Sequence, residues 1–438
     1  MLSYRALVFV VTVSLGLGLY GCSGGGGGTD PAPTPAPTPA PAATGSVVNT
    51  FPTSGRHVAP KIVFNGAGVG IAVWESSDGP INSTDYAGRA IWYALYQNGQ
   101  WSEEAPLHTL PNAGTVSLGS SGFFQLDVAA SAGGFAVAWI QSDRTGNLSE
   151  PYRTNLYARV FDGAAWGAVA ALEARVTPAG DPVIVSNGNG YLVAWSQYNE
   201  TTIRSTIYTN LHNGTSWQGA VDIANSTNVL IEPRLTSNGA GYAVAWIESV
   251  GAVHKLNARL YTGGAWGTAQ SFADVGGYHG APYLASSGGN YLLVWNVSGG
   301  ASLGYHSAGS GTTWSAPQGL VLGWIHDFAA SGSGYAAVYR CSPLSPTEQS
   351  LCAKAYTGGA WGAELALETY TTNSVNAVLA SDGTGYGVFW RQHSTSADDY
   401  GVYYTTFTAT DAATPLQVSA ARGPYEDSLP PYTSPREA

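Results

Sequence analysis

The chain has 438 residues and a formal net charge of −11, from 17 Lys and Arg against 28 Asp and Glu. Only 10% of its residues are charged, where soluble domains usually show roughly 25%. The acidic, lysine-poor composition argues against a nucleic-acid partner, because phosphate binding needs clustered Lys and Arg, and the 44% apolar content excludes disorder of the whole chain.

The N-terminus has the features of an export signal. Arg5 precedes an apolar run, Ala6 to Tyr20, that is too short for a membrane span. The run ends in Leu19-Tyr20-Gly21-Cys22, which resembles the lipobox of bacterial lipoproteins. The resemblance implies removal of residues 1–21 and lipidation of Cys22, with palmitate among the expected acyl chains. The alternative is a plain secretory signal followed by a coincidental cysteine.

Residues 22–45 are expected to form a tether. The glycine run 24–28 is flexible, and the Pro-Ala-Pro-Thr repeats that follow favour extended polyproline II. Such a segment would hold a domain away from a membrane surface. Ser23 follows the cysteine, and by resemblance to the enterobacterial sorting rule this implies the outer membrane of a bacterial cell envelope, on either its periplasmic or its surface face.

From residue 46 to residue 420 the chain is repetitive. A Gly-aromatic-x-x-x-Trp motif recurs in seven copies, of which the first is weak, the fifth begins with Asn290 and the sixth ends in Tyr. The final aromatic residues of the copies are Trp74, Trp139, Trp195, Trp246, Trp295, Tyr339 and Trp390. A second tryptophan follows each of the first six copies: Trp101, Trp166, Trp217, Trp266, Trp314 and Trp361. Two markers in register indicate a repeat architecture.

Each copy is expected to form four short strands. In the third copy these are 182–186, 191–196, a strand around 206–211, and one that opens at Trp217, with Gly-rich turns between them. The second strand is apolar on both faces, which is typical of a strand buried between neighbouring sheets.

Seven units at a period of about 50 residues predict an all-β fold, a single β-propeller of seven four-stranded blades. The rival is an array of β-sandwiches, but those modules need about 100 residues each. The last outer strand could come from 413–420 or from Ser46 to Phe51. The Pro-rich tail 421–438 is expected to be disordered.

Two cysteines remain beyond the signal. Cys341 ends the second strand of copy six and Cys352 lies in its third strand. An exported compartment permits a disulfide between them, and the short connection favours it over a metal pair or free thiols. No other cysteine or spaced histidine supports a metal site, and no cofactor motif is present.

One strand-three to strand-four turn points to a family. Residues Ser307 to Trp314, with Gly309, Gly311 and Thr313 between them, resemble the Asp-box of sialidase-like propellers, with Gly309 in place of the aspartate. The whole unit also looks like the repeats of bacterial surface lipoproteins over about residues 57–420. The resemblance implies fold and location and no reaction, since Asp-boxes are structural turns. The sialidase Phe/Tyr-Arg-Ile-Pro signature is absent near the first copy, and Arg159 and Arg259 occupy equivalent, structural positions.

Candidate ligand-binding residues are those that break the repeat near the start of each first strand, where a propeller's innermost strands line its central channel. They are Gln125, Asp127, Asp181, Glu232, Arg234, Tyr283, His326, Asp327 and Asn376. Alternation places residues two apart on one face. These groups could bind a cation or sugar hydroxyls, or act as acid and base. They could equally solvate a water-filled channel and pair with Arg234.

The repeated aromatic residues are expected to pack between blades. Trp92, Tyr198, Tyr278, Trp324 and Tyr400 fall outside the two tryptophan markers and are better candidates for stacking on a sugar. His108, His212 and His306 have no partner at metal-ligand spacing, and we expect them on the solvated surface.

The sequence thus predicts a monomeric, lipid-anchored propeller that binds a glycan or an envelope protein and is not an enzyme. The alternatives are a lectin with repeated pockets, a sialidase-like glycoside hydrolase or lyase, and an envelope assembly scaffold.

Overall fold

The chain is an all-β protein whose seven antiparallel sheets are the blades of a seven-bladed β-propeller, as predicted. The computed structural model describes residues 56–77, 90–109, 125–142, 154–173, 177–199, 201–251, 253–272, 282–297, 303–321, 323–332, 334–341, 350–368, 374–393 and 400–417. The predicted signal (1–21), tether (22–45) and tail (421–438) lie outside these ranges, as do Cys22 and the strand considered at Ser46 to Phe51. None of the described residues forms a helix of the length and apolarity that crossing a bilayer requires.

The chain divides into two compact units, the first of which holds blade 1. Ala72, Trp74 and Ala94 form its core, and Trp92 and Trp101 pack against them. Trp92 is therefore part of a blade core. The strands of blade 1 are β1 (Arg56–Phe64), β2 (Gly70–Ser77), β3 (Ala90–Gln97), β4 (Gln100–Trp101) and β5 (Ala105–Thr109).

The second unit holds blades 2 to 7. Blade 2 contains β6 (Leu126–Ala130), β7 (Phe135–Ser142), β8 (Thr154–Phe161) and β9 (Ala170–Ala171). Blade 3 contains β10 (Ala179–Ser186), β11 (Tyr191–Asn199), β12 (Arg204–His212) and β13 (Trp217–Ser226). Blade 4 contains β14 (Val229–Ser237), β15 (Tyr242–Val250), β16 (Val253–Thr262), β17 (Ala265–Trp266) and β18 (Gln270–Ser271).

The other three blades follow the same order. Blade 5 contains β19 (Tyr283–Ser287), β20 (Asn290–Val297), β21 (Leu303–Ser310), β22 (Thr313–Trp314) and β23 (Gln318–Val321). Blade 6 contains β24 (Ile325–Ser331), β25 (Gly334–Arg340), β26 (Leu351–Thr357), β27 (Ala360–Trp361) and β28 (Leu365–Ala366). Blade 7 contains β29 (Ser374–Ser381), β30 (Tyr386–His393), β31 (Tyr400–Phe407) and β32 (Leu416–Gln417). Of the two candidates for the last outer strand, 413–420 supplies β32, which pairs with β31.

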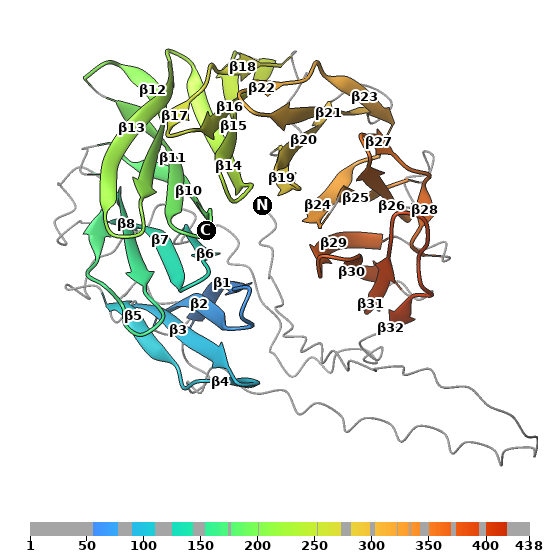
Figure 1. Cartoon of the computed structure of the whole chain (residues 1–438), viewed down its shortest axis with the longest axis horizontal. Helices are drawn as coiled ribbons and strands as arrows, with labels where there is room; N and C mark the ends of the chain where they lie inside the picture. The colour runs from blue at the N-terminus through green and yellow to red at the C-terminus, as the bar shows by residue number, and fades with distance from the viewer. Residues whose placement is uncertain are drawn as a thin grey trace, which may run out of the picture. The chain divides into compact units, whose positions relative to one another are not determined.

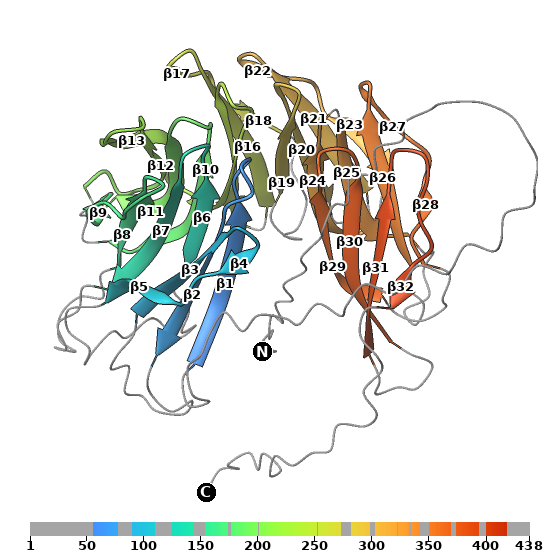
Figure 2. The same ribbon diagram turned by 60° about the horizontal axis from the view of Figure 1, so that its bottom comes forward.

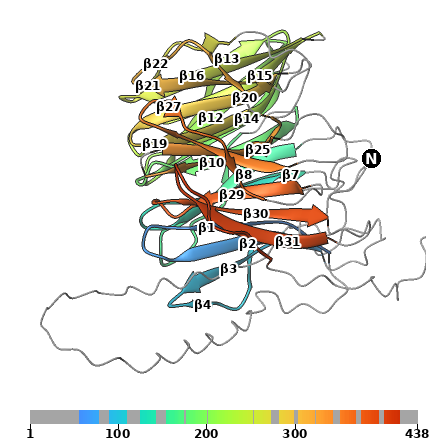
Figure 3. The same ribbon diagram turned by 90° about the vertical axis from the view of Figure 1, so that its right-hand side faces the viewer.

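Within the second unit, the first strands of successive blades contact one another in the order β6, β10, β14, β19, β24, β29 and face a common centre (Figure 1). Blades 2 and 7 lie at the two ends of this series (Figure 2), and the long strands of neighbouring blades form successive layers when seen from the side (Figure 3). In each blade the first strand begins where the second one ends, as Ala179 pairs with Gln197 in blade 3. We name this the loop end of the blade and the opposite one the hairpin end.

The glycine of the repeat is required at the hairpin end. A Cβ atom at Gly190 would lie 2.1 Å from the carbonyl oxygen of His212, and one at Gly134 would lie 1.9 Å from that of Phe161. Only glycine permits this approach of the second strand to the end of the third. The second tryptophan then covers the ring that ends strand three, as in Phe161–Trp166 with centroids 5.3 Å apart.

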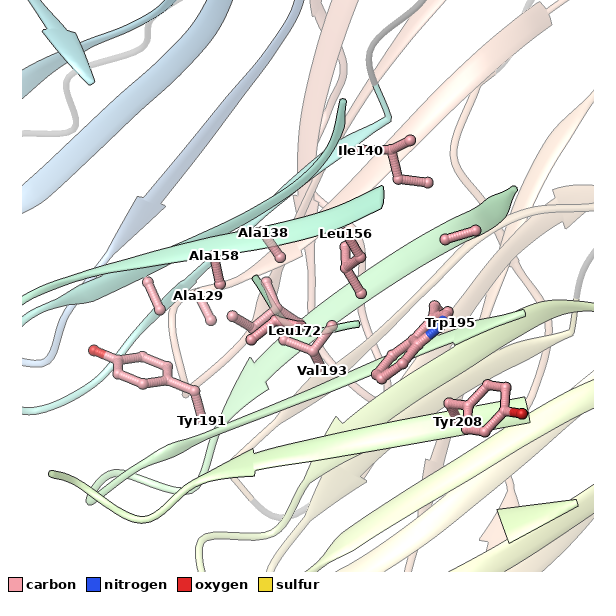
Figure 4. Packing of buried hydrophobic residues seen from close by; sticks show 13 residues of the cluster. Ala129, Ala138, Ile140, Leu156, Ala158, Leu172, Tyr191, Val193, Trp195 and Tyr208 are labelled. Carbon is pink, nitrogen blue, oxygen red and sulfur yellow. The ribbon is translucent and has the colours of Figure 1, made fainter. Parts of the chain in front are cut away.

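The aromatic markers pack between blades, as predicted. Trp139 and Trp195 are fully buried, and Figure 4 shows Trp195, Val193 and Tyr191 of blade 3 in one cluster with Ala138 and Leu156 of blade 2. The Tyr191 hydroxyl also donates to Ser131 Oγ in the hairpin of blade 2, at 2.8 Å. Blade 3 therefore packs directly against blade 2.

A buried polar bridge joins blades 2 and 3 near their loop ends, and the sequence did not indicate it. Glu173 accepts the Leu156 backbone N–H at 3.0 Å and the Gln197 amide at 2.9 Å, and Gln197 in turn accepts the indole N–H of Trp195 at 3.1 Å. Each of these buried polar groups therefore has a hydrogen-bond partner, as is usual for polar groups inside a protein.

The disulfide and two histidines lie in the packed parts of the blades. The disulfide between Cys341 and Cys352 is confirmed, with the Cα atoms 5.6 Å apart. The surface placement of His212 and His306 is wrong, since both are buried. His212 ends β12 in the place of an aromatic ring and contacts Trp217, while His306 Nδ1 accepts the Trp361 indole N–H at 3.4 Å. A histidine thus substitutes for a ring in the packing.

Candidate functional site

The first strands of neighbouring blades bring several predicted site residues together. Gln125 of blade 2 donates from Nε2 to Asp181 Oδ1 at 3.2 Å, and its Oε1 accepts the Asp181 backbone N–H at 2.7 Å. Because both bonds cross from one blade to the next, the amide fixes Asp181 at the loop end of blade 3.

Asp181 and Glu232 share an unusual backbone. Their φ angles are 54° and 53°, in the left-handed region that non-glycine residues rarely occupy. Each precedes a proline, and the strand register shifts at the same place, between Gly180 and Val183 and between Ile231 and Arg234. The bulges turn these side chains away from the regular pleat, and strained residues of this kind concentrate at functional sites.

Glu232 and Arg234 flank Pro233 at the loop end of blade 4, and both are half-buried. Glu232 makes no hydrogen bond or ion pair within the described ranges. The Arg234 guanidinium makes one weak bond, from Nη1 to the Pro233 carbonyl at 3.4 Å. Burial raises the pKa of the Glu232 carboxyl, the Arg234 charge lowers it, and Asp181 raises it. The Glu232 carboxylate and most donors of the Arg234 guanidinium therefore lack hydrogen-bond partners within the described ranges.

Tyr283 of blade 5 continues the series. Its hydroxyl donates to the Ile325 carbonyl at 2.8 Å, with the His326 carbonyl 3.3 Å away. Burial raises its pKa to about 12, with Asp327 raising it and Arg234 lowering it. Tyr283 thus stays neutral and ties the first strand of blade 5 to that of blade 6. Five residues, Gln125, Asp181, Glu232, Arg234 and Tyr283, form what we name the inner-strand cluster.

Asp127 and Asp327 are placed differently. Asp127 Oδ2 accepts the Ile184 backbone N–H of the next blade at 3.0 Å, and Asp327 Oδ2 accepts the Leu379 N–H of the next blade at 2.8 Å. The structure therefore uses both carboxylates to hold adjacent first strands together, and we leave them out of the cluster.

His326 lies in the bulge that opens β24, between Ile325 and Asp327. Asn376 lies in β29, but its side chain falls outside the described part of the chain, as does that of Tyr400, and Tyr278 lies outside the described ranges altogether. Tyr198 and Trp324 are 44% and 38% exposed, and both lie at loop ends, of blades 3 and 6.

Arg159 and Arg259 make the same structural hydrogen bond in their blades. Arg159 donates to the Gly167 carbonyl at 2.7 Å, and Arg259 donates to the Gly267 carbonyl.

A metal has little to bind in the described ranges. Cys341, Cys352 and Glu364 are the one group of three possible ligands close to one another there. The two sulfur atoms already share a disulfide. A cysteine binds a metal as a thiolate, so these two sulfur atoms are not available as ligands.

No protein-family model matches the chain, and no curated protein is significantly similar to it. Among solved structures, it is similar to a puromycin-hydrolyzing peptidase of Mycobacterium tuberculosis at 12% identity and a TM-score of 0.46, over 82% of this chain and 53% of that one. It is similar to an α-L-arabinanase of Penicillium chrysogenum complexed with arabinobiose at 14% identity and a TM-score of 0.39, over 65% of this chain and 89% of that one. It is also similar to a Trypanosoma rangeli sialidase in complex with sialic acid at 12% identity and a TM-score of 0.36, over 66% and 56% of the two chains. At such identities a shared fold says nothing of activity.

Proposed function

We propose that the chain is an exported, lipid-anchored β-propeller that binds a glycan at the inner-strand cluster and does not turn it over. The observation that carries the proposal is the open pair of Glu232 and Arg234. A sugar ring offers adjacent hydroxyls that both donate and accept, so one face of it satisfies a carboxylate and a guanidinium together.

Exposed rings at the loop ends of blades 3 and 6 support a sugar ligand. Tyr198 and Trp324 stand at loop ends with large exposed areas, where aromatic faces combine an apolar surface with a polar group. Concave sites with a few convergent polar groups beside aromatic residues are the usual form of small-ligand sites.

The first-strand carboxylates favour binding over hydrolysis. Most glycoside hydrolases use two carboxyl groups, one on each side of the bond that breaks, whereas sialidases use a tyrosine nucleophile. Asp127, Asp181 and Asp327 each bond protein groups, which leaves Glu232 as the carboxylate of this set without a hydrogen bond. The described first strands therefore offer no second carboxylate without a hydrogen bond, which favours binding over the two-carboxylate reaction.

A glycan array tests the proposal. The protein would be residues 23–438, which keep every described residue, as wild type and as the variants Glu232→Gln and Arg234→Gln. We expect binding that each variant weakens at least about tenfold, because each loses a charged hydrogen-bond partner. Binding unchanged in both variants would indicate pockets between blades, as in a lectin with repeated sites. No binding would contradict a glycan ligand and favour a protein partner, such as an envelope assembly factor.

The proposed cellular location rests on the sequence alone. We propose that Cys22 is lipidated and that the tether holds the propeller at the outer membrane, as a monomer. Labelled palmitate should enter the wild type and not the Cys22→Ser variant, and the variant should leave the membrane fraction. Label in both would show a different anchor.

We also propose that the β21–β22 hairpin is a degenerate Asp-box. It joins strands three and four of blade 5, Gly311 adopts a φ of 61°, and Trp314 is buried against Phe272 and Tyr291. Such a turn supports the blade and adds no chemistry.

A further inference from the structure

Blade 6 has two nitrogen-bearing side chains at its loop end, from adjacent strands. His326 is the extra residue of the bulge between Ile325 and Asp327. Arg340 ends β25, and its backbone N–H donates to the Trp324 carbonyl at 2.9 Å. The first and second strands of the blade therefore bring these two residues together.

Both side chains bury a nitrogen atom that has no hydrogen-bond partner in the part of the chain that the structure describes. These atoms are Nε2 of His326 and Nε of Arg340. A buried polar atom without a partner costs about 1–3 kcal/mol. Other described side chains, among them Thr206 and Trp314, also bury such an atom, but His326 and Arg340 are both basic and act on each other electrostatically.

Within the described ranges, no carboxylate is hydrogen-bonded or ion-paired to either side chain. Asp327 is next in sequence, but its oxygens accept the backbone N–H groups of Phe328 and Leu379. Glu364 accepts the Tyr339 hydroxyl at 2.6 Å. Burial lowers the pKa of His326 to about 4, and the Arg340 charge adds to this effect. Burial also lowers the pKa of Arg340.

The pair borders the inner-strand cluster. The Tyr283 hydroxyl, which belongs to that cluster, lies within hydrogen-bond distance of the His326 carbonyl. The loop ends of blades 3 and 4 carry Asp181 and Glu232 together with Arg204 and Arg234, and that of blade 6 carries Asp327 together with His326 and Arg340. Arg340 therefore adds a cationic side chain beside the cluster.

We propose that His326 and Arg340 bind an oxyanion, and that the glycan of the preceding section is an acidic saccharide whose carboxylate or ester phosphate lies there. A guanidinium binds such a group in a planar, bidentate way, and the imidazole adds a second donor once it is protonated. This inference rests on the proposed function for the saccharide, but the anion position stands on blade 6 alone.

Inorganic phosphate tests the anion position without any glycan. Calorimetric titration of phosphate into the wild type should give saturable binding, and Arg340→Gln should weaken it about tenfold or more, the value of one lost charge-assisted bond. Arg204→Gln is the matched control, because Arg204 is an exposed arginine at the loop end of blade 3, and it should change the affinity less than about twofold. His326→Gln serves as the second variant if Arg340→Gln does not fold.

Equal phosphate affinity in Arg340→Gln and the wild type, or no phosphate binding by the wild type, would overturn the anion position. Neither result touches the glycan proposal, which depends on Glu232 and Arg234. A second titration compares glucose with glucuronate: the wild type should prefer glucuronate, and Arg340→Gln should lose the preference while it keeps any binding of neutral sugar. An equal preference in both proteins would overturn the acidic saccharide.

Discussion

The side chain of Gln125 holds Asp181 of the next blade through two hydrogen bonds, from Nε2 to Oδ1 at 3.2 Å and from the Asp181 backbone N–H to Oε1 at 2.7 Å. One amide therefore fixes both the carboxylate and the left-handed backbone of its neighbour. The inner-strand cluster depends on the contact between blades, so a substitution at Gln125 on blade 2 should change the position of Asp181 on blade 3.

Gln125→Ala should lower the free energy of unfolding by about 1 kcal/mol, because both inter-blade bonds are lost at an exposed position. Urea denaturation measures the change. Gln218→Ala is the matched control, since the Gln218 amide is exposed and bonds Ser216 within its own turn, and it should cost less than about 0.5 kcal/mol. Equal losses of stability in the two variants would contradict a stabilising role of the Gln125–Asp181 hydrogen bonds.

Asp327→Ala should destabilise the protein by about 1–3 kcal/mol, because the Leu379 N–H of blade 7 loses its acceptor. Binding of glycan should change little by comparison with Glu232→Gln. A variant of full stability that no longer binds would instead place Asp327 in the ligand site.

Gly134→Ala should cost more than about 2 kcal/mol, because its Cβ atom would lie 1.9 Å from the Phe161 carbonyl oxygen and the backbone must move. The neighbouring Gly133 has nothing within 4 Å of its Cβ position, so Gly133→Ala should stay within about 0.5 kcal/mol of the wild type. Urea denaturation of both variants decides whether the repeat glycine acts through this close approach.

Stability should fall as the pH falls from about 6.5 to about 4. The pKa of His326 is about 4 in the folded protein, whereas the ordinary histidine value of 6.5 applies to the unfolded chain. The unfolded chain therefore binds more protons between these two pH values. The loss is at most about 3 kcal/mol and ends below the folded pKa. His326→Gln should remove this part of the pH dependence.

The groups that face His326 matter for this measurement. They are Arg340 on β25, Asp327 next in the chain, and the Tyr283 hydroxyl at its carbonyl. Burial raises the pKa of Asp327, which has the opposite effect on stability, but both proteins retain Asp327. The difference between wild type and variant therefore isolates the histidine, and an unchanged difference from pH 7 to pH 4 would show that His326 does not titrate as described.

Removal of the disulfide by Cys341→Ser together with Cys352→Ser should cost about 2–3 kcal/mol, the loop-closure entropy for a sequence separation of 11. Thermal unfolding with and without a reductant gives the same comparison in the wild type. Equal stability of the oxidised wild type, the reduced wild type and the variant would contradict a stabilising role of the disulfide.

The blades were predictable because their signals are local: a glycine, a ring and a tryptophan recur with each hairpin. The cluster was predictable only in part, because side chains at the first strands meet across blades. Alternation indicated that Asp127 faces the channel with Gln125, but the Ile184 N–H of the next blade captures its carboxylate. Arg340 was missed because it breaks the repeat on the second strand, one residue after the marker Tyr339.

Hydrogen–deuterium exchange of the wild type, with and without a glycan that the array identifies, tests most directly whether the ligand lies at the inner-strand cluster. Ligand contact should slow amide exchange in β14 (Val229–Ser237) and β19 (Tyr283–Ser287). Exchange in the outer strand β13 (Trp217–Ser226) should remain the same. Protection confined to β13 or to other outer strands, with β14 and β19 unchanged, would contradict the account.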